Sequence, residues 1–272
     1  MTVTGRDLEA GFRSLRLGKA PVIFHASLKA FGQVGGGAET VVEALVNSFP
    51  AALASAFTYK TMVTPGTGPE GNAIVYGSGQ DANRMAEFFT PDMPADSLMG
   101  VIPETLRRNP RANRSDHPIF SFAGIGADPF LAAQTLAEPF APLGALEQAG
   151  GWVLLMGVDH TVNTGIHVAE KLAGRRAFVR WALTPEGVRE CPSFPGCSAG
   201  FDAIVPEVEK QTRRVKIGEA TVQAVPLKAL FKAVKALIKK DPLALLCQRE
   251  DCARCNQIRA LTRPHEPTKA GK

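Results

Sequence analysis

Two histidines and two acidic residues lie close together in the segment VDHTVNTGIHVAE, residues 158 to 170. His167 and Glu170 are three residues apart, so a short helix would place both side chains on one face. A carboxylate that holds one imidazole nitrogen fixes the tautomer and leaves the other nitrogen free as a general base. Asp159 and His160 follow an apolar run that predicts a buried strand, and α/β proteins commonly place sites at that edge. The segment predicts a catalytic pair; a pair that only packs and caps is the alternative.

Three consecutive glycines, Gly35, Gly36 and Gly37, separate an apolar segment from a helical pattern. Such a turn directs backbone N–H groups and the positive end of the helix dipole toward one spot, which suits phosphate or pyrophosphate. The turn is not a Walker sequence, because Ala38 and Glu39 follow it, and it lacks the G-x-G-x-x-G spacing of dinucleotide sites. An anion site and a tight structural turn therefore both remain open.

Three of the five cysteines lie near the C-terminus, where Cys247, Cys252 and Cys255 have the spacing C-x₄-C-x₂-C. Structural zinc is held tetrahedrally by four thiolates, often with a C-x₂-C pair, and Cys197 is the candidate fourth ligand. The spacing predicts a Cys₄ site that holds the C-terminal segment against the loop after Cys191. Reduced, unliganded cysteines are the alternative, and the odd number does not favour a disulfide framework.

Covalent catalysis has no support in the sequence. Ser27 and Ser115 lack the G-x-S-x-G elbow, and no cysteine is a sequence neighbour of a histidine. A zinc protease is excluded as well, because HTVNTGIH contains no H-E-x-x-H.

The elements that must position these residues alternate between strand and helix patterns through residue 174. This order predicts an α/β fold with a mixed central sheet flanked by helices, followed by a C-terminal helical and hairpin extension. The continuous apolar runs PVIFHASL (21–28) and GWVLLMGV (151–158) are typical of strands buried on both faces. Residues 66–96 are rich in Gly, Pro, Asn and Ser and predict a long loop region. We expect one domain over 1–272, with its core at about 20–175 and the possible Cys₄ site in 176–272.

Composition sets limits on location and partners. With 272 residues, 45% of them hydrophobic and 21% charged, the chain is an ordinary globular one. Its apolar runs are too short for a membrane span, and charges interrupt what would have to be a secretory signal, so we expect a cytoplasmic protein without a membrane partner. The formal net charge of +5 is small. Residues 228–240 predict an amphipathic helix with a solvated lysine face, so we expect no nucleic-acid partner.

Taken together, these segments resemble the aminoglycoside 3-N-acetyltransferase family, the antibiotic N-acetyltransferases. The matching segments occur in family order over about residues 20–175, and they are HASLKAFGQVGGGAETVVEAL, FTPDMPADSLMGVIPETLRRNP, RSDHP followed by SFAGIG, PLGALEQAGGWVLLMGV and NTGIHVAE.

The resemblance implies direct transfer of an acetyl group from acetyl-coenzyme A to an amine of an aminoglycoside. His167 matches the histidine of the family's LHxAE segment, with Ile166 in place of leucine, and would be the general base; Glu170 would orient it. From the residues themselves, the developing oxyanion needs hydrogen-bond donors, which the NT pair, Asn163 and Thr164, can supply; Asp159 completes the predicted catalytic set.

The resemblance also implies a coenzyme site. Ser27 and the three glycines would lie against the pantetheine arm and the pyrophosphate. Arg114, Ser115 and His117 match the family's RSxHP segment and would line the same cleft.

Departures from the family pattern concern the acceptor. Polycationic aminoglycosides prefer an acidic pocket, and the family's Trp/Asp-rich segment before FTP is replaced here by YGSGQDANRMAEF. The family's SPLG segment reads APLG in this chain, at residues 141–144. Two alternatives therefore stay open: an N-acyltransferase acting on another amine in biosynthesis or self-protection, and a catalytically silent coenzyme A-binding protein. The sequence does not indicate an oligomeric state.

Overall fold

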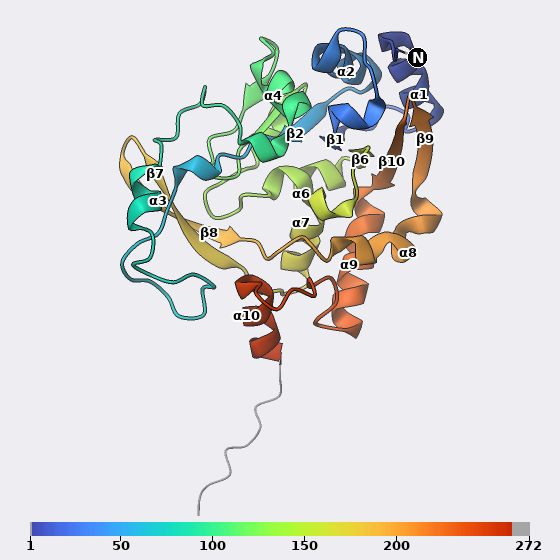
Figure 1. Cartoon of the computed structure of the whole chain (residues 1–272). Helices are drawn as coiled ribbons and strands as arrows, with labels where there is room; N and C mark the ends of the chain where they lie inside the picture. Colours follow the sequence, from blue (N-terminus) through green and yellow to red (C-terminus); the bar gives the residue numbers. More distant parts are fainter. Residues whose placement is uncertain (1, 263–272) are drawn as a thin grey trace, which may run out of the picture.

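A seven-stranded mixed sheet forms the centre of the computed structural model, which describes residues 2–262 (Figure 1). The strand order is β4-β5-β2-β1-β6-β10-β9. β1 pairs in parallel with β2 and β6, and the outer pairs are antiparallel. The strands are β1 (Val22–Ala26), β2 (Ala52–Ser55), β4 (Asn113–Arg114), β5 (Phe122–Ile125), β6 (Trp152–Met156), β9 (Arg213–Ile217) and β10 (Ala220–Pro226). The predicted α/β fold with a mixed central sheet is confirmed.

The central strands are buried on both faces, as their continuous apolar runs predict. In β1, Ile23 packs into one hydrophobic layer and Phe24 into the layer on the opposite face. The Phe24 layer is covered by α1 (Gly5–Ser14), α2 (Gly37–Ser48) and α4 (Val101–Arg108). The Ile23 layer is covered by α6 (Ala141–Gln148), α7 (Gly165–Leu172) and α9 (Leu227–Lys240).

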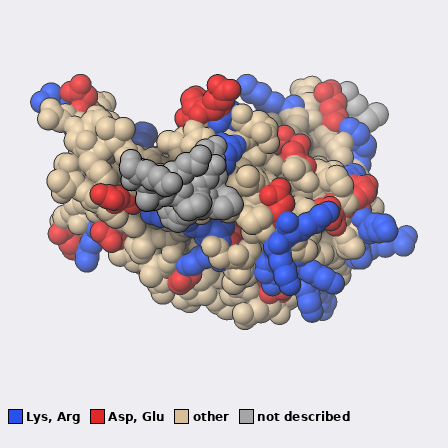
Figure 2. All heavy atoms as spheres, turned by 90° about the horizontal axis from the view of Figure 1, so that it is seen from below, with Lys and Arg blue, Asp and Glu red and all other residues tan. Residues whose placement is uncertain are grey.

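α9 has the amphipathic pattern predicted for 228–240. Its apolar residues Leu230, Phe231 and Val234 are buried, and its lysines are exposed. Figure 2 views the molecule from the end where α9 and α10 lie, and it shows both basic and acidic side chains, with basic ones gathered at the lower right.

A second sheet of three antiparallel strands lies beside the first. It consists of β3 (Met62–Val63), β7 (Phe178–Thr184) and β8 (Gly187–Phe194). The sequence ALASAFTYKTMVTP at 52–65 predicts one strand, but it is divided between the two sheets, because η2 (Tyr59–Thr61) turns the chain after β2. The hydroxyl groups of Thr58 and Thr61 both donate to the carbonyl of Pro118 and stabilise this turn.

Residues 66–96, all of which the structure describes, form the predicted loop region and contain a single short helix, α3 (Gln80–Arg84). The sequence DPFLAAQTLAEPFA at 128–141 predicts a helix, but the helix α5 ends after one turn (Asp128–Leu131), and the next helix, α6, begins only at Ala141. The side-chain amide of Gln134 donates to the carbonyls of Phe120 and Pro139, so tertiary hydrogen bonds hold the following residues as turns.

The C-terminal hairpin is part of the central sheet, since β10 pairs with β6. Gly218 lies in its turn with φ 56°, a left-handed conformation that glycine adopts without strain. η5 (Phe201–Ile204), α8 (Val205–Val208) and η6 (Glu209–Gln211) precede the hairpin, and α10 (Ala253–Thr262) follows α9. Within residues 2–262 no helix has the length and apolar character that a membrane span requires.

Candidate active site

A cavity of about 710 Å³ lies where the parallel strands β1, β2 and β6 end. His25 and Ser27 at the end of β1, Ser55 at the end of β2 and Val158 after β6 all line it. The ends of neighbouring parallel strands meet at one edge of a sheet, which is where open α/β folds bind ligands. Much of the remaining wall is aromatic and comes from Phe57, Tyr59, Phe120, Phe140 and Phe194.

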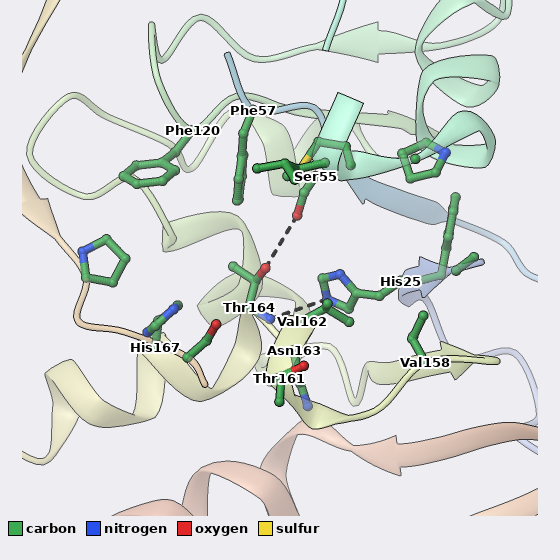
Figure 3. Close-up of a pocket in the computed structure, with 18 of the residues that line it drawn as sticks. His25, Ser55, Phe57, Phe120, Val158, Thr161, Val162, Asn163, Thr164 and His167 are labelled. Atoms are coloured by element: carbon green, nitrogen blue, oxygen red, sulfur yellow. Dashed lines mark hydrogen bonds between the residues drawn. The ribbon is translucent and has the colours of Figure 1, made fainter. Parts of the chain in front are cut away.

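His167 reaches this cavity from α7 (Figure 3). Its Nδ1 lies 2.9 Å from Oε2 of Glu170, one helical turn further along, so the two side chains share a face as their spacing predicts. The imidazole packs between the rings of Phe140, at 6.0 Å between centroids, and Phe201, at 4.7 Å. Nε2 of His167 has no hydrogen-bond partner among residues 2–262. A fixed imidazole with a free Nε2 at a cavity is suited to accept a proton.

Arg175 completes this arrangement and was not identified from the sequence. Its Nη1 donates to Oε1 of Glu170 at 2.9 Å, and its Nη2 donates to the carbonyls of Pro242 and Ala244, both at 2.8 Å. The Arg175 and Glu170 side chains are 3% and 5% exposed, so the pair is buried, and both carboxylate oxygens are hydrogen-bonded. No local spacing could reveal these contacts, because the two carbonyls lie 67 and 69 residues further along the chain.

Thr164, the residue before α7, lies on the cavity wall between His167 and His25. Its N–H donates to Nε2 of His25 at 3.4 Å, and its hydroxyl lies 3.4 Å from that of Ser55; dashed lines mark both contacts in Figure 3. Burial, with a smaller effect of His160, lowers the pKa of His25 to about 4. His25 is therefore neutral near pH 7 and accepts a hydrogen bond from the Thr164 N–H. In the sequence, the position of His25 near the end of a predicted strand is the one feature that could have indicated it as a site residue.

Asp159 is not among the residues that line the cavity. Its carboxylate accepts hydrogen bonds from the N–H and the hydroxyl of Thr161 and caps η4 (His160–Val162). The structure gives Asp159 this local role, and its catalytic role stays a prediction.

Of the residues predicted to bind coenzyme, Ser27 lines the cavity, together with Leu28 and Lys29. The three glycines do not. The N–H of Gly35 donates to the carbonyl of Val3, that of Gly37 donates to the carbonyl of Val34, and Gly36 and Gly37 have φ values of 78° and 66°. The structure thus shows the geometry of a tight turn, and contact with phosphate stays a prediction.

Arg114, Ser115 and His117 line a separate cavity of about 530 Å³. The Arg114 guanidinium donates to the carbonyls of Ala56 and Pro91, among others, and burial lowers its pKa to about 10. Nδ1 of His117 accepts the N–H groups of Ile119 and Phe120, and burial lowers its pKa to about 4. These residues hold the segment that carries Phe120 to the main cavity; their contact with coenzyme stays a prediction.

All four predicted metal ligands lie close together. The Sγ atoms of Cys197, Cys247, Cys252 and Cys255, hereafter the cysteine cluster, all lie within 4.8 Å of one another, and all four residues are buried. Cys191 lies apart from them in β8, where burial raises the pKa of its thiol to about 12. The spacing therefore identified a real cluster, and its occupancy by zinc stays a prediction.

The charged side chains on the cavity wall are basic. They are those of Lys29 and Arg254, and no Asp or Glu is among the described lining residues of the cavity. Glu170 lies behind His167, where Arg175 neutralises it.

Comparison with known proteins gives matches to one enzyme family. The family model described as Aminoglycoside 3-N-acetyltransferase matches residues 23–239. Aminoglycoside N(3)-acetyltransferase VII of Streptomyces paromomycinus is 37% identical over 233 residues, which are 75% of this chain and 76% of the relative.

Solved structures show the same fold. The apoenzyme of aminoglycoside acetyltransferase AAC(3)-IVa is 20% identical with a TM-score of 0.78, over 96% of this chain and 98% of that one. AAC-IIIb in its binary complex with CoASH is 25% identical with a TM-score of 0.71, over 88% of this chain and 97% of that one.

Proposed function

The chain belongs to the aminoglycoside 3-N-acetyltransferase family, and from this premise we propose that it transfers the acetyl group of acetyl-coenzyme A directly to an amine of an aminoglycoside. The observation that carries the proposal is the hydrogen-bonded series from Arg175 through Glu170 to His167, which ends at the wall of the large cavity. Acetyl-coenzyme A is a cytoplasmic metabolite, so we propose that the reaction takes place there.

His167 acts as the general base in this proposal. Glu170 accepts a hydrogen bond from Nδ1–H, so the proton stays on Nδ1 and Nε2 carries the lone pair. Nε2 takes a proton from the amine as the amine nitrogen forms a bond to the thioester carbonyl carbon. When the C–S bond then breaks, the imidazolium returns the proton to the departing thiolate. General base catalysis of this kind contributes a factor of about 10² to 10⁴.

Thr164 supports the tetrahedral intermediate. Within the described part of the chain, its hydroxyl has one hydrogen-bond partner, the Ser55 hydroxyl at a long 3.4 Å, so it is free to turn toward an oxyanion in the cavity. Its position directly before α7 adds the positive end of the helix dipole. A donor directed at a developing oxyanion is among the larger contributions to acyl transfer.

The donor occupies the part of the cavity beside Ser27, Leu28 and Lys29. Lys29 is exposed at this end, where its ammonium group supplies charge for the coenzyme phosphates. The apolar lining around Leu28 and Val101 suits the pantetheine arm.

Thiol release from acetyl-coenzyme A, measured with a panel of aminoglycosides and simpler amines, tests the proposal. We expect thiol release that depends on the amine. Mass spectrometry should show a product with the mass of the amine plus one acetyl group in place of a hydrogen atom. Absence of release with every amine, in a protein that still binds acetyl-coenzyme A, would instead support the silent coenzyme A-binding alternative.

A second candidate acceptor is an amine of low positive charge, and one observation favours it. The cavity carries Lys29 and Arg254 but no carboxylate among its described lining residues, so a polycation would meet like charge there. The same panel separates the two: a higher kcat/KM for aromatic or acidic amines than for aminoglycosides identifies this candidate, and the reverse order rejects it.

A further inference from the structure

We propose that the cysteine cluster binds one Zn²⁺ ion and that this ion fixes the two chain segments on which His167 depends. The zinc part of the proposal stands on the cluster alone, whereas its consequence for turnover rests on the proposed acetyltransferase function.

The geometry of the four thiols fits zinc. In a tetrahedral Cys₄ site with Zn–S bonds near 2.3 Å, the sulfur atoms are about 3.8 Å apart. In this structure all four Sγ atoms lie within 4.8 Å of one another, and those of Cys247 and Cys255 are 3.5 Å apart. The cysteines carry no disulfide, and burial keeps competing water away from them.

Backbone contacts around the cluster resemble those that orient metal ligands. The N–H of Ala199 donates to Sγ of Cys197 at 3.4 Å, as second-shell donors to thiolates do. The backbone of Gly200 approaches the other segment so closely that a Cβ there would lie 2.6 Å from the carbonyl oxygens of Leu245 and Leu246. Residues 197–200 and 245–247 are therefore in direct contact at the ligands.

Both of these segments support His167. On one side, Phe201 follows the Cys197 loop and places its ring 4.7 Å from the imidazole. On the other side, the carbonyls of Pro242 and Ala244 precede Cys247 and hold Arg175, which holds Glu170. An ion that joins Cys197 to Cys247 thus fixes both the packing and the hydrogen-bonding support of the imidazole.

A residue between the two cysteines of the C-x₂-C pair forms part of the cavity wall. Arg254 lies between Cys252 and Cys255 and donates to the carbonyls of Pro195 and Gly196, at 3.3 and 3.0 Å. Arg254, Pro195 and Gly196 all line the cavity. In Figure 1, α10 accordingly lies beneath the end of β8. Loss of the ion would loosen this wall together with the His167 supports.

Zinc content of the full-length protein, purified without chelators, tests the binding step. We expect one equivalent per chain by elemental analysis, its loss in Cys252→Ser and Cys255→Ser, and its retention in the matched control Cys191→Ser. Because the ligand variants could fail to fold, wild-type protein is also stripped and reloaded with Co²⁺, which should give the visible absorption of a tetrahedral thiolate complex. Less than a tenth of an equivalent of zinc, together with no Co²⁺ spectrum under reducing conditions, would overturn the proposal.

Hydrogen exchange tests the positioning step without reference to catalysis. Zinc-free protein should exchange faster than the zinc form in residues 194–201 and 242–258, while α2 on the opposite face of the sheet serves as the unchanged control. Equal exchange in both segments would overturn the positioning role even if zinc binds. If zinc binds and orders these segments but no amine is acetylated, the proposed function fails and the zinc site stands.

Discussion

Nδ1 of His167 lies 2.9 Å from Oε2 of Glu170, and the other oxygen of that carboxylate is held by Arg175. The Arg175 guanidinium therefore fixes the carboxylate that orients the imidazole. Its two oxygens serve different partners, so a change at Glu170 affects the tautomer of His167, and a change at Arg175 acts through Glu170.

We predict that Glu170→Gln lowers kcat by about 10²-fold or more, with little change in the KM for acetyl-coenzyme A. The glutamine amide can donate to Nδ1, which favours the tautomer that carries the proton on Nε2 and so blocks its role as base. Steady-state kinetics measure the effect, and circular dichroism confirms that the variant is folded. An unchanged kcat in folded protein would remove Glu170 from the mechanism.

Substitution of Thr164 tests the oxyanion site. We expect Thr164→Ala to lower kcat by about 10²-fold, because a donor to the oxyanion is lost. Thr164→Ser retains the hydroxyl and is the matched control, for which we expect activity close to wild type. If Thr164→Ala has unchanged kcat and intact folding, another group stabilises the oxyanion.

Lys29 is predicted to contribute to donor binding alone. Its exposed ammonium at the cavity would pair with coenzyme phosphates, so Lys29→Ala should raise the KM for acetyl-coenzyme A several-fold and leave the KM for the amine unchanged. The wild-type KM for the donor should rise with salt more steeply than that of the variant, because salt screens exposed charges. A change confined to the amine KM would place the donor elsewhere.

Stability should fall as the pH drops below about 6.5. Burial lowers the pKa values of His25 and His117 from 6.5 to about 4, so between these pH values the unfolded chain binds protons that the folded chain does not. The contribution of each histidine to the free energy of unfolding is fully present above pH 6.5 and is lost as the pH falls toward 4. Once the pH is below both pKa values, the loss is about 3 kcal/mol for each histidine.

Denaturant titrations from pH 7 to pH 4 measure this loss. In His117→Asn the amide oxygen replaces Nδ1 as the acceptor for the Ile119 and Phe120 N–H groups but cannot be protonated. The variant should show a shallower decline than wild type. An equal decline in the two proteins would show that His117 does not titrate in this range.

Sequence patterns predicted the elements whose burial is regular along the chain. The apolar run at 151–158 became β6, and the periodic residues Leu230, Phe231 and Val234 became the buried face of α9. The cysteine cluster was found for a different reason: metal sites require particular ligand types, and C-x₂-C is itself a local constraint.

Contacts between distant segments could not be predicted in this way. RSDHP matches a family motif, yet Arg114 bonds to the carbonyl of Ala56, 58 residues earlier, so the motif positions Phe120 from outside the main cavity. Arg175 likewise has partners in the segment before Cys247. The segment 52–65 has no glycine or proline before its last residue to mark an interruption, and the tertiary hydrogen bonds of Thr58 and Thr61 lie where it is divided between two sheets.

The most direct test of the central claim is the rate of thiol release from acetyl-coenzyme A by His167→Ala, with the preferred amine at saturation. Since His167 is proposed as the base, we predict a kcat lower than that of wild type by a factor of about 10² to 10⁴. Acetyl-coenzyme A binding, measured by calorimetry, should be retained, because the proposed donor contacts are at Ser27 and Lys29, which line another part of the cavity. Wild-type turnover by the variant would contradict the assignment of His167 as general base.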